Sequence, residues 1–221
     1  MVGIVTDYAA EREAMVERQL RRRGISERQI LDAFRQVPRE EFVSDEYAHI
    51  AYGDHPLPIE ANQTISQPYI VALTIQAAGI GAGDRVLEVG SGSGYAAAVI
   101  SRIALKVIGI ERQHDLVEVS RDRLQRLGYD NIEIVEGDGT KGCPGHAPFD
   151  AIVAAASGSH VPKAFIEQLR DGGCIVMPVG DPGWVQELIK VTKRPDGSVE
   201  RQNLCGVRFV PLIGEEGWKD A

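Results

Sequence analysis

The chain has 221 residues, of which 43% are hydrophobic and 25% charged, values that are ordinary for a globular protein able to bury a core. A net charge of −8 and a pI of about 5.2 argue against nucleic acid or an anionic membrane as a partner. No apolar run approaches the ~20 residues of a bilayer span, and the N-terminus lacks the pattern of an export signal.

The N-terminal part, residues 1–83, is predicted to be a mostly helical extension. Asp7 or Thr6 can cap a helix that runs to Arg23 before Gly24, and the arginines of residues 21–23 then complement its C-terminus. A capping box at residues 26–29 predicts a second helix that ends at Pro38. Residues 51–63 are expected to be irregular, and residues 69–75 predict a further helix.

A glycine turn follows the first predicted strand of the core. The apolar run at residues 86–89 predicts a strand buried on both faces, and residues 95–100 predict a helix. Between them stand Gly90, Gly92 and Gly94, which allow a sharp turn with no Cβ between the backbone and a ligand. This arrangement predicts a cofactor site in front of the N-terminus of that helix.

Acidic residues end the next two predicted strands. Glu111 closes residues 106–110 and suits the two hydroxyls of a ribose, while Asp138 follows residues 132–136 and suits an adenine amino group. The spacing G-x-G-x-G differs from the dinucleotide pattern G-x-G-x-x-G. It therefore favours S-adenosylmethionine, which has no pyrophosphate, over a nicotinamide cofactor.

The rest of the chain alternates strands and helices. A capping box at residues 115–118 predicts a helix that stops at Gly128, and residues 149–154 predict the fourth strand. A helix over residues 162–169 is expected to close at the glycines of 172–173, before a fifth strand at 174–177. Residues 186–192 and 204–210 predict an antiparallel hairpin. We therefore expect one α/β domain over residues 1–221, a Rossmann-like methyltransferase sheet (84–221) that is mostly parallel, with a C-terminal hairpin and the N-terminal extension as a lid.

The cysteines and histidines give no pattern of a metal site or a disulfide framework. Cys143, Cys174 and Cys205 are far apart and form no C-x-x-C pair, which predicts reduced thiols and a cytoplasmic location. The five histidines are scattered as well, and no metal is predicted.

Several motifs together resemble the protein-L-isoaspartate O-methyltransferase family over nearly the whole chain. The most specific are Gln63-Thr64-Ile65-Ser66-Gln67-Pro68, the turn at residues 87–95, Gly137-Asp138-Gly139 and Phe209-Val210-Pro211-Leu212. The resemblance implies methylation of the free α-carboxylate of L-isoaspartyl residues in damaged proteins and peptides. The ester would then collapse to a succinimide, whose hydrolysis returns some normal aspartate.

The resemblance also implies roles for individual residues. Ser66 matches the active-site serine, although as a sequence feature alone it could equally cap a helix that begins near Pro68. The implied cofactor contacts are Gln63, Thr64, Ile65, Ser66, Glu88, Gly90, Ser91, Gly92, Gly94, Glu111, Arg112, Asp138 and Gly139. The implied substrate contacts are Ala156, Ser157, Gly158, Val210, Pro211 and Leu212.

Two segments depart from the family pattern. The family has a glycine-rich Ile-Gly-x-Gly-Gln-Thr where this chain has residues 59–64, and an Ala-Ala-Ala-Pro loop where it has residues 156–159. Two alternatives stay open: a carboxyl methyltransferase with another aspartyl or small-acid acceptor, and a non-catalytic adaptor that binds the cofactor. An adaptor would be expected to lack Ser66 or the acidic cofactor contacts, and this chain has them.

Overall fold

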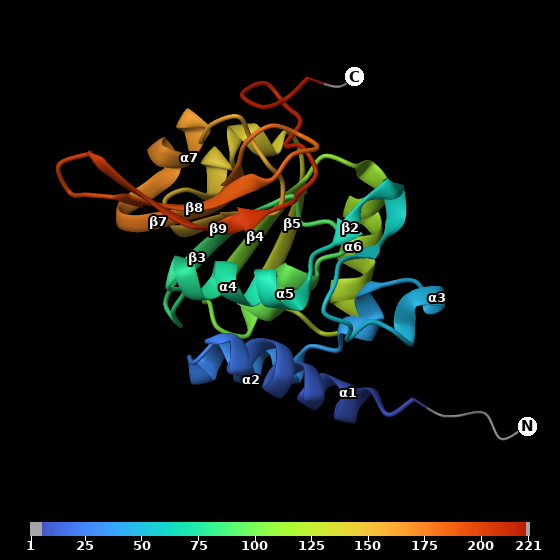
Figure 1. Ribbon diagram of the computed structural model, residues 1–221. Coiled ribbons are helices and arrows are strands. Elements are labelled where there is room, and N and C mark those ends of the chain that lie inside the picture. Colours follow the sequence, from blue (N-terminus) through green and yellow to red (C-terminus); the bar gives the residue numbers. More distant parts are fainter. Residues whose placement is uncertain (1–5, 220–221) are drawn as a thin grey trace, which may run out of the picture.

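A seven-stranded sheet forms the centre of the computed structural model, which describes residues 6–219. Its strands are β3 (Arg85–Val89), β4 (Lys106–Glu111), β5 (Ile132–Glu136), β6 (Phe149–Ala154), β7 (Leu169–Val179), β8 (Gln186–Lys193) and β9 (Val199–Val207). They lie in the order β5-β4-β3-β6-β7-β8-β9 (Figure 1). Neighbours from β5 to β7 are parallel, and β8 and β9 add an antiparallel hairpin. The predicted fold class is confirmed.

Helices precede the sheet in the chain and alternate with its strands. They are α1 (Tyr8–Met15), α2 (Arg28–Gln36), α3 (Asp45–Ala48), α4 (Pro68–Ala78), α5 (Tyr95–Ser101), α6 (His114–Arg126) and α7 (Lys163–Gln168). A small two-stranded ladder, β1 (Leu57–Pro58) with β2 (Thr64–Ile65), stands between α3 and α4. Of the predicted limits of the single domain, residues 1 and 221 lie outside the described residues.

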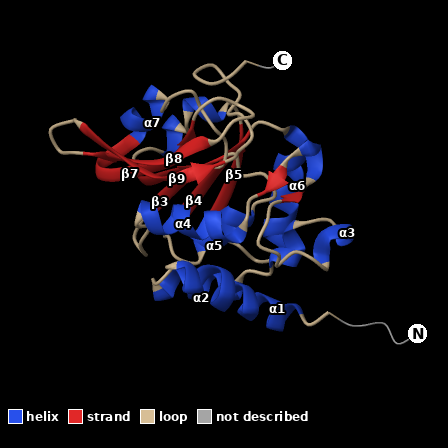
Figure 2. Cartoon of the chain, in the orientation of Figure 1, coloured by secondary structure: helices blue, strands red, loops and turns tan. Residues whose placement is uncertain are grey.

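Alternate residues of each strand serve two separate apolar layers. On β3, Val86 belongs to the layer that includes α2, α4 and α5, whereas Leu87 and Val89 face the layer that includes Phe165 of α7. Figure 2 shows the corresponding arrangement, with α4 and α5 on one side of the sheet and α7 on the other. When helices cover both faces of a parallel sheet, only the amino and carboxyl ends of its strands stay accessible. A ligand site at this sheet is therefore expected at the carboxyl ends of the strands.

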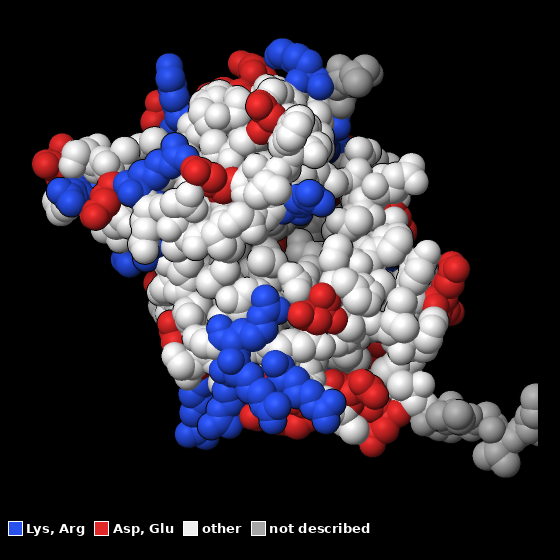
Figure 3. All heavy atoms as spheres, viewed as in Figure 1, with Lys and Arg blue, Asp and Glu red and all other residues white. Residues whose placement is uncertain are grey.

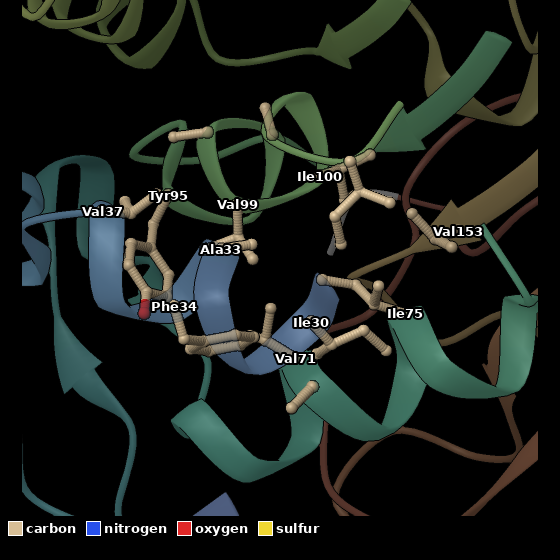
Figure 4. Packing of buried hydrophobic residues seen from close by; sticks show 14 of the residues in the cluster. Ile30, Ala33, Phe34, Val37, Val71, Ile75, Tyr95, Val99, Ile100 and Val153 are labelled. Atoms are coloured by element: carbon tan, nitrogen blue, oxygen red, sulfur yellow. The ribbon is translucent and has the colours of Figure 1, made fainter. Parts of the chain in front are cut away.

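The N-terminal helices form an additional layer that packs on α4 and α5. In Figure 4, Ile30 and Phe34 of α2 lie against Val71 and Ile75 of α4 and against Tyr95, the first residue of α5. The rings of Phe34 and Tyr95 meet edge to face, with their centroids 6.2 Å apart. Burial of these large side chains fixes the extension on the helix that begins at the glycine turn.

The predicted N-terminal helix is confirmed, but its geometry changes along its length. Asp7 is its cap and accepts a hydrogen bond from the Ala10 amide (3.1 Å). Beyond Met15 the helix continues as a π turn over Val16–Leu20 and a 3₁₀ turn over Arg21–Arg23, and it ends at Gly24 with φ 94°. The positive φ is the reason that a glycine stands at this end.

Other predicted helix ends were wrong, and at α2 the reason is that tertiary contacts replace the local ones. At α2 the Ser26 amide donates to Gln76 of α4 (3.2 Å), and Gln29 donates to the Ile80 carbonyl (3.1 Å), so no capping box forms. Helix α6 begins at His114, before the predicted box. Helix α7 ends at Gln168, and β7 already begins at Leu169, so the glycines of 172–173 lie within a strand. The fifth strand is therefore longer than predicted.

Charged side chains on the extension are largely paired with one another. In the face shown in Figure 3, basic side chains gather at the bottom, where Figure 1 places α1 and α2, and acidic ones lie beside them. Arg21 pairs with Glu17 (2.9 Å), and Arg23 pairs with Asp54 (2.9 Å). None of the helices within residues 6–219 combines the length and apolar character needed to cross a membrane.

Candidate active site

The glycine turn directly after β3 adopts a conformation that its glycines permit. Gly90 has φ 81° and Gly92 has φ 52°, and the Gly90 amide donates to the Ile110 carbonyl of β4 (2.8 Å). A Cβ added to Gly92 would lie 3.2 Å from Cδ1 of Ile59, a residue of the extension. The turn is thus fixed on the end of β4, and its middle lies close to the extension.

Glu111, at the end of β4, is buried and held by three backbone N–H groups. Its Oε2 accepts from Gly92 (3.0 Å), and its Oε1 accepts from Arg112 (2.8 Å) and Gln113 (3.0 Å). A carboxylate oxygen has more than one lone pair, so both oxygens can still accept from a hydroxyl. The predicted ribose contact therefore fits, with the carboxylate orientation set in advance.

Asp138 is more engaged by the chain itself than the sequence suggested. Its Oδ1 accepts from the Thr140 amide (2.9 Å) and hydroxyl (2.7 Å), and its Oδ2 accepts from the Glu215 amide (2.9 Å). Partial burial opposes ionisation, but these hydrogen bonds outweigh it and lower the pKa of Asp138. An adenine amino group would have to use a second lone pair of one of these oxygens, so this contact stays a prediction.

A narrow pocket lies between the turn and the extension. It is lined by Thr64, Ile65 and Ser66 from one side and by residues 90–93 and Glu88 from the other. Oε2 of Glu88 and the Ser91 hydroxyl are buried without a well-aligned hydrogen-bond partner among the described residues. Such atoms are rare in folded proteins unless a ligand or water serves them.

Glu88 lines this pocket and is the acid there that can pair with a positive charge. Burial raises the pKa of Glu88 to about 8, with the Glu111 charge adding to the effect and the nearby Ser91 and Ala97 groups opposing it. A bound ammonium or sulfonium would favour the charged form of such a carboxyl. S-adenosylmethionine carries both cations, so the buried Glu88 carboxyl and the glycine turn fit this cofactor.

Ser66 lines the same pocket and is positioned through its backbone. The N-cap of α4 is Gln67, so the alternative reading of Ser66 as the helix cap is wrong. The Ser66 carbonyl accepts from Nη2 of Arg39 (2.8 Å), and Arg39 also donates from Nε to Ala51 (2.8 Å). Arg39 is fully buried, and its guanidinium carbon lies 4.7 Å from the centre of the Tyr95 ring.

Arg39 is a functional candidate that sequence reasoning missed. Burial lowers the pKa of Arg39, although Tyr95 and Tyr52 partly oppose this. The Arg39 guanidinium thus contacts both the Ser66 carbonyl and the ring of Tyr95, the first residue of α5. In the sequence Arg39 stands beside two glutamates, where it has the appearance of an ordinary surface charge, so no local signal marks it.

The two predicted substrate segments lie side by side and bind each other. The Ser157 amide donates to Val210 (2.8 Å), the Leu212 amide donates to Ser157 (2.8 Å), and the Gly158 amide donates to Pro178 (3.2 Å). These backbone groups are therefore occupied. Ala156, Val210, Pro211 and Leu212 nevertheless line a large cleft.

The same large cleft brings together part of each predicted set of residues, whereas the predicted substrate residues Ser157 and Gly158 do not line it. Beside the substrate segments it is lined by Gln63, Gly92, Glu111 and Arg112. Trp218 lies on its wall and donates from Nε1 to the Ser157 carbonyl (2.9 Å). Trp218 was also missed, because nothing in the sequence indicates that the C-terminal residues fold back onto a loop 61 positions earlier.

The sheet is mostly parallel, with a glycine turn after its first core strand and a fixed acid at the end of the next. Together with a pocket that can hold a cation, these features define a Rossmann-like, S-adenosylmethionine-dependent methyltransferase. The family model described as protein-L-isoaspartate(D-aspartate) O-methyltransferase matches residues 10–217. The chain belongs to this family.

Relatives of known name are similar to this chain over nearly its full length. A protein-L-isoaspartate O-methyltransferase 2 from Pelobacter propionicus is 53% identical and covers 94% of this chain and 92% of its own. A protein-L-isoaspartate O-methyltransferase from Methanoculleus marisnigri is 50% identical (95% and 94%).

Two solved structures are similar in fold as well. One of a protein-L-isoaspartate O-methyltransferase has a TM-score of 0.86 at 32% identity and covers 93% of this chain and 67% of its own. The structure of a protein-L-isoaspartate O-methyltransferase (beta-aspartate methyltransferase) from Plasmodium falciparum in complex with S-adenosyl-L-homocysteine has a TM-score of 0.78 at 28% identity (91% and 98%).

Proposed function

We propose that this protein transfers a methyl group from S-adenosylmethionine to the free α-carboxylate of L-isoaspartyl residues in damaged proteins and peptides, and so initiates their repair through a succinimide. The observation that carries this proposal is the single cleft in which the turn and Glu111 face Val210, Pro211 and Leu212. Cofactor and acceptor can therefore meet in one space, as a direct transfer requires.

The site residues divide by the part of the reaction that each would serve. Thr64, Ile65, Glu88 and Ser91 would hold the methionine end of the cofactor in the narrow pocket. Glu111 would hold the ribose, and Asp138 with Gly139 the adenine. Residues 1–83, which reach the site with Gln63 to Ser66, would act as the lid that excludes water.

The chemistry requires mainly positioning from the chain. S-adenosylmethionine, when bound, supplies a methyl group activated by the sulfonium charge. An α-carboxyl group has a pKa near 3.5, so the acceptor is already an anion at neutral pH and no general base is needed. The Ser66 hydroxyl orients the reacting groups, and the lid and cleft walls keep water out.

The compartment is proposed on independent grounds. Cys143, Cys174 and Cys205 are all free thiols, which supports a reducing compartment such as the cytoplasm for this reaction. The acidic charge likewise supports a protein or peptide partner rather than nucleic acid.

The deciding experiment compares two peptides that differ only in isoaspartate against aspartate at one position. We expect transfer of labelled methyl to the isoaspartyl peptide and little to its isomer. The isomers have the same charge and differ in the placement of the carboxylate, and a misplacement of about 1 Å can cost on the order of a hundredfold in rate. Equal transfer would support a broader carboxyl methyltransferase, and no transfer to any acid would support an adaptor.

A second test addresses Ser66. The change Ser66→Ala removes the hydroxyl but keeps the carbonyl that Arg39 holds. It should lower kcat by more than it raises the cofactor Kd, because a positioning contact acts mainly on the transition state. Single-turnover methyl transfer and calorimetry measure the two quantities, and an unchanged kcat would reject this role of Ser66.

A further inference from the structure

The loop between β7 and β8, which adjoins the cleft through Pro182, carries two exposed apolar side chains. Trp184 is 76% exposed and Val185 62%, the highest values among the large apolar side chains of the described chain. Their loop neighbour Pro182 lines the cleft together with Val210 and Pro211. Exposed tryptophan next to a binding cleft is typical of a surface that binds a partner.

The loop is fastened to both of the segments that line the substrate side of the cleft. Gln186 is 1% exposed, and its side chain donates to Asp181 (3.3 Å) and accepts from the Phe209 amide (2.8 Å). On the other side the Gly180 amide donates to Gly158 (2.9 Å). Trp184 is therefore presented from a braced loop, and its position is coupled to the walls of the cleft.

We infer that Trp184 and Val185 bind an apolar side chain that flanks the isoaspartyl residue in the substrate, and so set the sequence preference of the enzyme. This inference rests on the proposed function. An acceptor within a polypeptide continues out of the cleft as extended chain, and the exposed Trp184 stands two positions after Pro182, which lines the cleft. The apolar surface of the loop selects an aliphatic or aromatic neighbour over a polar one.

The test uses two isoaspartyl peptides that are identical except that the flanking residues are phenylalanine or serine. Trp184→Ser should raise KM for the phenylalanine peptide about tenfold with kcat little changed, and leave the serine peptide unaffected. Leu105→Ser is the matched control, because Leu105 is 60% exposed but directly precedes β4, at the opposite edge of the sheet. Equal effects of Trp184→Ser on both peptides, or no effect, would overturn the inference.

A binding measurement tests this inference independently of the proposed function. The chain has two tryptophans, so the difference in acrylamide quenching between the wild type and Trp184→Phe reports Trp184 alone and leaves Trp218 in place on the cleft wall. The phenylalanine peptide should protect Trp184 from acrylamide quenching whether or not methyl transfer occurs. If the wild type methylated neither peptide, the proposed acceptor would be wrong, yet protection would still support this binding surface and its absence would overturn it. Protection that rises with protein concentration alone would assign the loop to a contact between two copies and overturn the inference as well.

Discussion

At the scale of single residues, Glu88 is the group whose chemistry departs most from its sequence context. It sits on β3, where alternate positions serve two apolar layers, and it is 2% exposed. A charged carboxylate that is so deeply buried disfavours folding unless a nearby cation compensates its charge. The pKa of Glu88 is raised for this reason, and a cation of the bound cofactor would favour the charged form again.

Replacing Glu88 with an uncharged isostere should therefore change how stability depends on pH. The folded pKa of about 8 lies above the ordinary value, so the contribution of Glu88 to stability is fully present below about pH 4.5 and is lost as the pH rises towards 8. Glu88→Gln has no such loss. The free energy of unfolding of the variant minus that of the wild type should rise between pH 5 and 8 by more than about 1.4 kcal/mol, the equivalent of one pKa unit.

Denaturant unfolding without cofactor at several pH values measures this difference. The other titrating groups cancel between the two proteins, so only Glu88 contributes. Parallel pH profiles would show that Glu88 titrates normally in the folded state.

At the scale of elements, the turn over Glu60–Asn62 carries an unusual backbone. Ala61 has φ 54° and Asn62 has φ 56°, both in the left-handed region. Asparagine tolerates this region, whereas alanine is strained there. Glu60 pairs with Arg123 of α6 (3.2 Å), and Arg123 also donates to the Ser93 carbonyl (3.0 Å), so the turn is tied to the glycine turn.

Ala61→Gly should stabilise the protein despite the flexibility of glycine. Relief of the left-handed strain, about 1–2 kcal/mol, exceeds the entropic cost of glycine, about 0.5–1 kcal/mol. Ala9→Gly is the matched control, because Ala9 is exposed within α1 and the same exchange there should destabilise by up to about 1 kcal/mol. Chemical denaturation gives both values, and a loss of stability at both positions would contradict the strain argument.

At the scale of the whole molecule, the site is formed by parts that are distant in the sequence. Residues 63–66, the turn after β3, the end of β4 and the C-terminal segment line the narrow pocket and the large cleft, which share Thr64, Gly90 and Gly92. A ligand bound there contacts both the extension and the sheet. Binding should therefore stabilise the complete fold and not one element alone.

S-adenosylhomocysteine at about 100 times its Kd should add about 2.7 kcal/mol of stability. For a protein of this size that raises Tm by about 5–10 °C. Gly92→Val should abolish the shift, because a Cβ at Gly92 would press on Cδ1 of Ile59 (3.2 Å) and a branched residue would strain the turn at φ 52°. Gly145→Val should keep it, because a Cβ at Gly145 meets nothing within 4 Å. Calorimetric scans decide the point, and a full shift in Gly92→Val would place the ligand elsewhere.

The order and type of the core elements followed from the sequence by itself. Apolar runs at 86–89, 106–110 and 149–154 have the pattern of buried parallel strands, and glycines between a strand and a helix indicate a turn that faces a ligand. Glu111 could be found for the same reason, since an acid at a parallel strand end must lie at the carboxyl edge. These signals are local and depend on a few neighbouring residues.

Only the tertiary structure decided which polar groups are buried and what each of them binds. Arg39, Trp218 and Gln186 are positioned by segments far away in the chain, and Asp138 is held in part by the Glu215 amide. The helix ends at α2 moved because Gln76 and Ile80 supplied partners that no local pattern contains. Backbone periodicity is a property of neighbouring residues, whereas burial and hydrogen-bond partners depend on how distant segments pack.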